Sequence, residues 1–379
     1  MAVVACPDVG DDPQELDAED QEVKDPKREE YDEPVPFSVL VQAQGQEDEE
    51  QKREEPVIKE KILWERNGPG EVTEFRIPLL IQVPTGDLLA FSEARKYSGA
   101  DAGAKFIAMR RSRDGGDTWD PTAFILNDYY SVPDGTNLGT VTIEHETNKL
   151  ILIHTFCIHH SSPSCLNGTG ENPTGLYMVT SSDWGYSWSK SVYLGDRNPL
   201  LKGIQYNPGP GYGIQKKYEP NKGRLVSCGQ GVTGLYCLVS DGKELYQVVE
   251  LKNGTLLINA RNQHTFHCSC RIQALSFDGG ETFPLPQVTF KEELIDPRVC
   301  GSLLNYNDTL FFSNPFNAKS RINLTLHWST DSGETYPHYF TIHPKGSGYS
   351  CLTTIDENHI GMVYEKNDIA YISFLKIQL

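Results

Sequence analysis

The sequence predicts an all-β protein, a six-bladed β-propeller in which one blade is incomplete. Three observations lead to this prediction. A short turn pattern recurs four times, apolar runs that alternate like strands flank its copies, and the composition is rich in turn-forming residues, with 33 Gly and 23 Pro in 379 residues. Gly and Pro punctuate β proteins at their turns, so this composition is typical of many short strands joined by tight connections.

The turn pattern has the form Ser-x-Asp-x-Gly-x-Thr/Ser-aromatic. Its four copies begin at Ser112, Ser181, Ser276 and Ser329. Asp and Ser side chains bond nearby backbone amides, Gly adopts a positive φ, and the aromatic residue packs back onto the sheet. Each copy therefore predicts a hairpin turn, and we expect these residues to stabilise hairpins and to do no chemistry.

The spacing of the copies sets the number of blades. The Asp-to-Asp distances along the chain are 69, 95 and 53 residues, and repeats of about 40–50 residues with four strands each indicate propeller blades. From Lys61 onward the chain has room for six blades of about 53 residues. Within the longest gap, Ser240-Asp241-Gly242 begins like a fifth copy and then stops. We therefore expect a piece of about 25–30 residues to be missing from one blade.

The net charge of −18 is concentrated at the N-terminus. Residues 1–70 hold 21 acidic and 8 basic side chains, which leaves a balance of only −5 for the rest of the chain. With few aromatic or β-branched residues, this segment cannot bury enough apolar surface to offset the entropy of ordering. The predicted domains are a disordered acidic tail over residues 1–61 and a propeller domain over residues 62–379.

The composition also excludes several classes of protein. An acidic balance argues against nucleic acid as a partner, because phosphate binding needs clustered Lys and Arg. No run approaches the roughly 18 consecutive apolar residues of a transmembrane helix. A Ser/His/Asp hydrolase is excluded because no G-x-S-x-G elbow is present and His159 and His160 have no evident nucleophile beside them.

Signals for the cellular compartment conflict. The apolar segment from Met1 to Cys6 is too short for a secretory signal and has no basic residue before it. Four N-glycosylation sequons favour the secretory route, and they begin at Asn167, Asn253, Asn307 and Asn323.

The cysteines carry two expectations. Nine are present, an odd number, so at least one stays unpaired within the chain. Cys268 and Cys270 are separated by a single residue, unlike a CxxC pair, so a metal site is not expected there.

The four turn copies, together with Phe75-Arg76-Ile77-Pro78, resemble the Asp boxes and the first arginine motif of the sialidase (neuraminidase) family. The resemblance covers nearly everything after about residue 62. It is closest to the animal lysosomal-type sialidase, through segments such as VPDGTNLG, LLINARNQ and FFSNP. It implies an exo-α-sialidase, a glycoside hydrolase that removes terminal α-linked sialic acid from glycoproteins, oligosaccharides and gangliosides with retention.

Sialic acid carries a carboxylate on its anomeric carbon, and Arg holds a carboxylate through a bidentate fork. The resemblance implies six substrate-binding residues, which are Arg76, Arg261, Arg321, Arg95, Asp134 and Glu365. Glu365 resembles the carboxylate that orients the first arginine, with an ordinary strand-end ion pair as the alternative. Because arginines supply the positive charge, no metal or cofactor is expected.

The catalytic residues follow from the same resemblance. Sialidases use Tyr as the nucleophile, and a neutral phenol approaches the substrate carboxylate without the repulsion that another carboxylate would meet. Tyr349, within Gly346-Ser-Gly-Tyr-Ser350, resembles this nucleophile. A Tyr with a pKa near 10 is a weak nucleophile and needs a base. Asp101 resembles the general acid/base that protonates the leaving group.

The base is where the sequence departs from the family pattern. In the setting E-x-Q-V-V-E-L the base position holds Leu245, and Glu244 comes one residue early. A shift of one residue in a strand turns the side chain to the opposite face. Tyr349 is left without its base unless Glu244 rotates in as the catalytic base or Glu250 substitutes, and Glu250 also faces the wrong side in a regular strand. Loss of a general base costs about 10²–10⁴ in rate. The alternative function is a catalytically impaired Asp-box propeller that binds sialosides or a protein partner.

The resemblance also implies partners and a location. The expected partners are sialylated glycoconjugates and a chaperoning protein in the lysosome, with membrane association that is not integral. The implied location is the lysosome or a membrane surface, and it becomes the cytoplasm if the absence of a signal peptide is genuine.

Overall fold

The computed structural model describes residues 2–5, 56–68, 71–127, 135–159, 173–203, 206–231, 234–240 and 248–379. These residues all fall within one compact unit. Its elements are β-strands and three short 3-10 helices at Leu194–Asp196, Pro199–Leu201 and Leu285–Gln287. Within the described ranges, no helix has the length and apolar character needed to cross a membrane.

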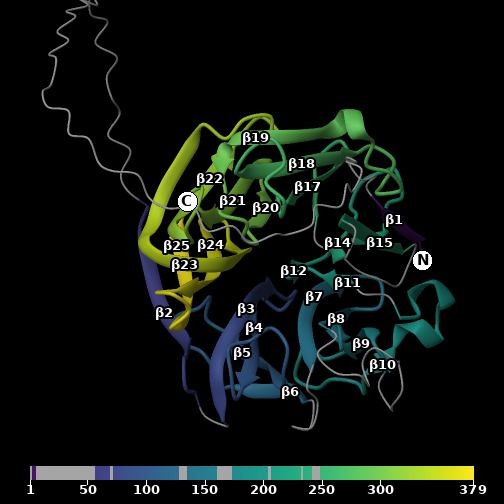
Figure 1. Ribbon diagram of the computed structural model, residues 1–379, viewed down its shortest axis with the longest axis vertical. Coiled ribbons are helices and arrows are strands. Elements are labelled where there is room, and N and C mark those ends of the chain that lie inside the picture. The colour runs from purple at the N-terminus through teal and green to yellow at the C-terminus, as the bar shows by residue number, and fades with distance from the viewer. Residues whose placement is uncertain are drawn as a thin grey trace, which may run out of the picture. The chain divides into compact units, whose positions relative to one another are not determined.

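The strands form antiparallel blades that surround a common centre, and Figure 1 looks along the axis of this ring. The first blade contains β3 (Val72–Gln82), β4 (Leu88–Lys96), β5 (Lys105–Ser112) and β6 (Ala123–Asn127). The second contains β7 (Thr136–Glu144), β8 (Lys149–Phe156), β9 (Gly175–Ser181) and β10 (Val192–Tyr193), with β12 (Gly211–Tyr212) parallel to β7. The third contains β11 (Tyr206–Pro208), β14 (Leu225–Gly231) and β15 (Gly234–Ser240), with β13 (Ile214–Gln215) paired to β14.

The remaining blades follow in chain order. The fourth contains β16 (Val249–Glu250), β17 (Leu256–Ala260), β18 (Cys270–Ser276) and β19 (Val288–Ile295). The fifth contains β20 (Ser302–Tyr306), β21 (Thr309–Pro315), β22 (Ile322–Ser329) and the first half of β23 (His338–Asp356). The sixth contains the second half of β23, β24 (His359–Lys366), β25 (Tyr371–Gln378) and β2 (Ile58–Glu65). The predicted all-β propeller of six blades is confirmed.

The four copies of the turn pattern follow the third strand of the first, second, fourth and fifth blades. In the last copy the Ser329 hydroxyl donates to Asp331 Oδ1 at 2.6 Å, and the amide of Gly333 donates to Ser329 Oγ at 2.9 Å. Gly333 has a φ of +86°, which a residue with a side chain rarely adopts. The aromatic residue of this copy, Tyr336, is buried. The copies are hairpin turns, as the pattern predicts.

The third blade is the incomplete one. Its third strand, β15, ends at Ser240, where the truncated copy of the turn pattern begins, and residues 241–247 lie outside the described ranges. The fourth-strand position is occupied by β1 (Ala2–Ala5), which pairs antiparallel with β15 from Ala2 opposite Val239 to Ala5 opposite Tyr236. Figure 1 shows β1 beside β15. The fourth strand of this blade is therefore a strand from the far N-terminus, and not the segment that directly follows β15.

The predicted boundary of the acidic tail can be compared with these strands. Residues 2–5 and 58–61 lie within the predicted tail, yet they belong to β1 and β2. Residues 6–55 lie outside the described ranges, so their predicted disorder stays a prediction.

Cysteines join neighbouring strands and leave thiols over. Cys228 and Cys237 face each other across β14 and β15 and form a disulfide, and Cys268 is bonded to Cys270. Cys300 and Cys351 are free, as an odd number of cysteines requires of at least one.

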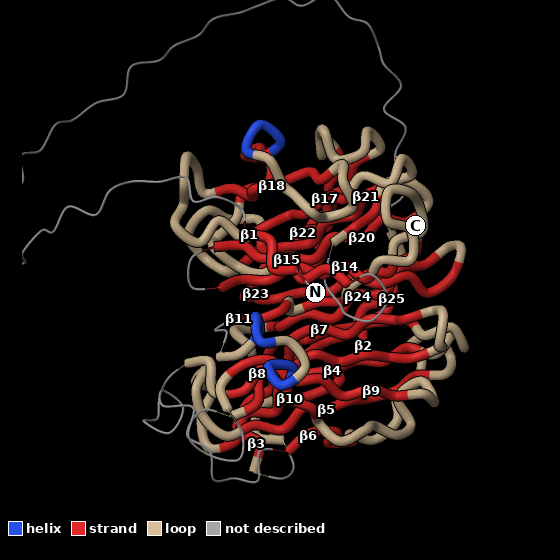
Figure 2. Tube along the Cα trace, turned by 90° about the vertical axis from the view of Figure 1, so that its right-hand side faces the viewer, coloured by secondary structure: helices blue, strands red, loops and turns tan. Residues whose placement is uncertain are grey.

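Figure 2 shows the blades from the side, with loops gathered at both ends of the strands.

Candidate active site

The predicted site residues come from different blades but lie at one end of the strands. Asp101 lies on the loop that joins β4 to β5, whereas the turn pattern that begins at Ser112 follows the other end of β5. Arg261 follows the end of β17, and Arg321 directly precedes β22. In an antiparallel blade these connections reach the same end, so the chemistry and the Asp-box turns lie at opposite ends of the propeller.

Glu365, at the end of β24, organises one wall of the site. Its Oε1 accepts from Arg76 Nε at 2.7 Å and from the amide of Ile77 at 3.0 Å, and its Oε2 accepts from the amide of Tyr349 at 3.0 Å. The Glu365 side chain is 0% exposed. A single carboxylate thus fixes both the predicted first arginine and the predicted nucleophile.

The local sequence permits this approach. A Cβ atom on Gly348 would lie 2.1 Å from Glu365 Oε2, so only glycine fits before Tyr349. Burial alone would lower the pKa of Arg76, but the charge of Glu365 outweighs it and raises the pKa, so Arg76 stays a cation. The arrangement holds a guanidinium ready for an anion while its own charge is balanced.

Tyr349 lies where the three predicted arginines converge. The guanidinium carbons of Arg76 and Arg321 lie 5.9 and 5.6 Å from the centre of its ring, and Arg261 Nη1 donates to its hydroxyl at 3.1 Å. Such a cluster fits an anionic group placed above the phenol. The structure therefore brings together Arg76, Arg261, Arg321, Tyr349 and Glu365.

Cys300 is a residue of this cluster that the sequence did not single out. Cys300 is a free cysteine of intermediate burial, and its thiol acts electrostatically on both Tyr349 and Arg261. The negative charge that its thiol can carry, together with burial, raises the pKa of Tyr349 far above the ordinary value, so the phenol is neutral. The only signal in the sequence was the odd number of cysteines, which does not say which one stays free.

Asp101 is held by Arg95. Arg95 Nη2 lies 2.7 Å from Asp101 Oδ1, and the Asp101 side chain is 67% exposed. Burial would raise the pKa of Asp101, but the charge of Arg95 outweighs it, and the pKa lies below its ordinary value. The position is open to a leaving group, and the carboxylate form dominates until a substrate brings further negative charge.

Arg95 itself is buried and bonded to several protein groups. Its side chain is 2% exposed and also binds Glu93 Oε2 at 2.9 Å and the Gly99 carbonyl at 2.6 Å. These contacts let Arg95 hold Asp101 in position, and its predicted role as a substrate-binding residue stays a prediction.

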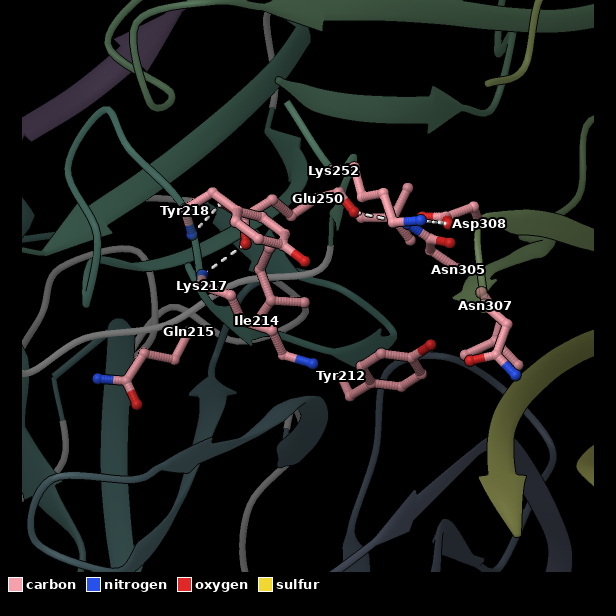
Figure 3. Close-up of a pocket in the computed structure, with 12 residues that line it drawn as sticks. Tyr212, Ile214, Gln215, Lys217, Tyr218, Glu250, Lys252, Asn305, Asn307 and Asp308 are labelled. Atoms are coloured by element: carbon pink, nitrogen blue, oxygen red, sulfur yellow. Dashed lines mark hydrogen bonds and ion pairs between the residues drawn. The ribbon is translucent and has the colours of Figure 1, made fainter. Parts of the chain in front are cut away.

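Glu250, one of the two predicted substitutes for the base, points elsewhere. It pairs with Leu256 at the start of β17, whereas Arg261 follows the end of that strand. Its carboxylate accepts from Lys216 Nζ at 2.7 Å and from the amide of Tyr218 at 3.1 Å. Glu250 and Tyr218 line a cavity of about 530 Å³ at the end of the blades away from Tyr349, shown in Figure 3. Glu250 therefore cannot serve Tyr349.

Two predicted residues stay untested. Asp134 and Glu244, like Leu245, lie outside the described ranges. Within those ranges, no group of three or more His, Cys, Asp or Glu side chains is placed to hold a metal ion.

The chain is similar in sequence and in fold to several known proteins. The family model for the BNR repeat-like domain matches residues 86–364. A sialidase of Micromonospora viridifaciens is 29% identical over 84% of this chain and 54% of its own length, and one of Bacteroides fragilis is 27% identical over 82% and 63%. The chain thus spans little more than half of these relatives. The intramolecular trans-sialidase of Ruminococcus gnavus has the same fold, with a TM-score of 0.70 at 17% identity over 83% of this chain and 96% of that protein.

Proposed function

This chain belongs to the family of BNR repeat-like domain proteins, and from that premise, together with its similarity to bacterial sialidases, we propose that it is an exo-α-sialidase. Its substrates are terminal α-linked sialic acids on glycoproteins, oligosaccharides and gangliosides. The proposal includes the animal lysosomal subgroup, with a lysosomal or membrane-associated location and a chaperoning partner. The observation that carries it is the convergence of three guanidinium groups on one phenol, since a sugar acid needs such a cluster.

The roles follow from the positions. Arg76, Arg261 and Arg321 hold the carboxylate of the sugar, which brings the anomeric carbon over the hydroxyl of Tyr349. Tyr349 attacks this carbon while Asp101 protonates the departing oxygen, and a covalent intermediate forms. Water activated by Asp101 then releases the sugar from Tyr349, and two displacements give retention of configuration.

The exposed side chain of Asp101 supports this division of labour. A general acid must reach a leaving group that points to solvent, whereas the nucleophile works under the sugar. Tyr349 is half-buried, as a residue under the ring should be. Arg95 keeps Asp101 at the rim between the two steps.

The test compares the unmodified protein with Tyr349→Phe on a fluorogenic sialoside. We expect kcat to fall by about 10²–10⁴ or more, because the substitution removes the reacting oxygen. The affinity for 2-deoxy-2,3-didehydro-sialic acid should change little, because the arginines remain. The control is Tyr218→Phe, at the distant cavity, which should keep full activity. Proton NMR of the first product formed should show the α-anomer.

The alternative is a propeller that binds sialosides without hydrolysing them. The displaced base at Leu245 favours it. Tight binding of the dehydro analogue by an unmodified protein that has no turnover would establish this alternative and reject the enzyme. Absence of both binding and turnover would reject both functions.

A further inference from the structure

The cavity in Figure 3 takes no part in the proposed reaction, and three blades border it. The third blade contributes β13 and the loop that follows it, the fourth contributes β16, and the fifth contributes the end of β20 with its turn to β21. The volume of about 530 Å³ lies within the range of about 300–1,000 Å³ that is usual for small-molecule sites. A cavity of this size can hold a small ligand.

Hydrogen bonds hold the walls of the cavity in place. Glu250, whose side chain is 6% exposed, accepts from Lys216 Nζ at 2.7 Å. It also accepts from the amides of Lys217 and Tyr218 at 2.5 and 3.1 Å, so one carboxylate fixes the loop after β13. Asn305 Nδ2 donates to the Glu250 carbonyl at 2.7 Å and joins the fifth blade to the fourth. The walls are therefore formed before a ligand arrives, which lowers the entropic cost of binding.

The charged groups of the cavity are mostly neutralised in pairs. Glu250 is bonded to Lys216, and Lys252 forms an ion pair with Asp308. Among the described residues that line the cavity, Lys217 is the one further cation, and it is exposed. An anionic ligand calls for several converging cations, like the arginines of the candidate active site, and a cationic ligand calls for unpaired carboxylates. The lining therefore favours a ligand that is polar and carries no charge.

The lining offers an aromatic face together with polar side chains. Tyr218 is 42% exposed, and Figure 3 shows its ring across the cavity from Asn307 and Asp308. Asn307 and Asp308 are exposed residues of the turn between β20 and β21. A pyranose ring presents C–H groups on its faces and hydroxyls around its rim, and each hydroxyl both donates and accepts. An aromatic face opposite a carboxamide and a carboxylate fits this combination.

We propose that this cavity is a non-catalytic binding site for a neutral saccharide of one or two rings. Tyr218 packs against a face of the sugar, while Asn307 and the ion pair of Lys252 with Asp308 bond its hydroxyls. Because the cavity lies at the end of the blades away from Tyr349, a saccharide bound there does not compete with a ligand of the arginine cluster. Binding there does not depend on the proposed sialidase activity.

The experiment titrates the full chain, free of N-linked glycans, with neutral sugars. Glucose, galactose, mannose, N-acetylglucosamine, lactose and maltose are the probes, and saturation-transfer NMR measures Kd. Protein without glycans is used because Asn307 begins a sequon, and a glycan attached there would cover the cavity. We expect saturable binding of at least one sugar, with Kd unchanged when the dehydro analogue is present. Absence of saturable binding by every sugar would overturn the proposal.

Matched variants locate the binding. Tyr218→Ala removes the aromatic face, and we expect Kd for the bound sugar to rise by about tenfold or more. Asn307→Ala should raise Kd by about three- to tenfold, because hydrogen bonds to the sugar are lost. The control is Tyr186→Ala, an exposed tyrosine on the second-blade turn and outside the cavity, which should leave Kd within about twofold. Thermal unfolding of each variant separates a loss of binding from a loss of fold.

Other results would also overturn the proposal. If Tyr218→Ala leaves Kd unchanged, or if the dehydro analogue displaces the sugar, the saccharide binds elsewhere. If inorganic phosphate binds more tightly than any sugar and loses its affinity in Lys217→Ala, the cavity is an anion site. Failure of the proposed sialidase is seen separately, as an absence of turnover on the fluorogenic sialoside while sugar binding is intact.

Discussion

The third and sixth blades are both completed by a strand from the N-terminal side of the chain, but they use different strands. The sixth receives β2, eight residues that pair along β25 and bury Leu63 and Trp64. The third receives β1, four residues that pair with β15. The sixth blade is closed by the segment directly before the propeller, whereas the third is completed by a strand from more than fifty residues further away in the sequence.

The difference extends to the chemistry that each region carries. The sixth blade supplies Glu365 and Tyr349, whose polar groups meet Arg76 of the first blade in a closed set of hydrogen bonds. The fourth blade, which follows the gap, supplies Arg261, and its Nε is buried without a partner among the described residues. The half of the site on the sixth blade is therefore fully hydrogen-bonded, whereas the half on the fourth blade keeps one buried donor without a partner among the described residues.

The largest effect, on the free energy of unfolding, is expected from Glu365→Ala in the sixth-blade half of the site. Removing a fully buried carboxylate leaves Arg76 without its counter-charge, and breaking such a pair costs about 3–5 kcal/mol. Chemical denaturation at neutral pH measures the free energy of unfolding. The control is Lys366→Ala on the same strand, whose partner Glu60 lies at the surface, with an expected loss below about 1 kcal/mol.

Glu365→Gln sharpens this result. The amide keeps the shape of the side chain but not its charge, so we expect a smaller loss of stability and a weaker affinity for the dehydro analogue. If Glu365→Ala lowers the free energy of unfolding by less than 1 kcal/mol, this carboxylate does not stabilise the arrangement of Arg76 and Tyr349 in the way we infer.

An intermediate effect is expected when β1 is deleted. Without residues 2–5, the edge of β15 loses its ladder partner, and we expect the midpoint of thermal unfolding to fall by about 2–4 °C. Amides of β15 should exchange hydrogen faster, while those of β25 should not change. The control removes four residues from the acidic stretch 41–50. Equal exchange in the deleted and unmodified proteins would show that the third blade does not depend on β1.

The sequence predicted those parts of the molecule that carry a local pattern. The turn at Ser329-x-Asp331-x-Gly333 is specified by its own side chains, so its position and its hairpin followed directly. Arg76, Arg261, Arg321, Tyr349 and Glu365 could be named from their motifs, and the blades bring them together.

Other parts depended on contacts that no local pattern contains. The pairing of Ala2–Ala5 with β15 joins residues more than 230 positions apart. Their apolar run is short and precedes a long acidic segment, so the local sequence did not predict a strand there. Cys300 lies on a turn shaped by Asp296 and Arg271, which come from separate strands or loops, so nothing adjacent in sequence marks its thiol. The direction of Glu250 was fixed by Lys216, a buried cation from the preceding blade.

The smallest effect is expected from Asp331→Ala, in the fifth-blade turn whose counterpart the third blade lacks. Burial would raise the pKa of Asp331, but hydrogen bonds from Ser329 and Thr335 outweigh it and hold the pKa at about 2. A lowered folded-state pKa stabilises the fold above the unfolded value near 4, and this contribution disappears as the pH falls through about 2.

Because Asp331 is exposed, we expect the substitution to cost only about 1 kcal/mol at pH 7. Urea denaturation at pH 7 and at pH 2 measures the difference between the variant and the unmodified protein, which should shrink toward the acidic end. Glu334→Ala, an exposed residue of the same turn, is the control and should show no such trend. A difference that stays constant between the two pH values would mean that the turn is held by its glycine and aromatic residue, and not by the ionised Asp331.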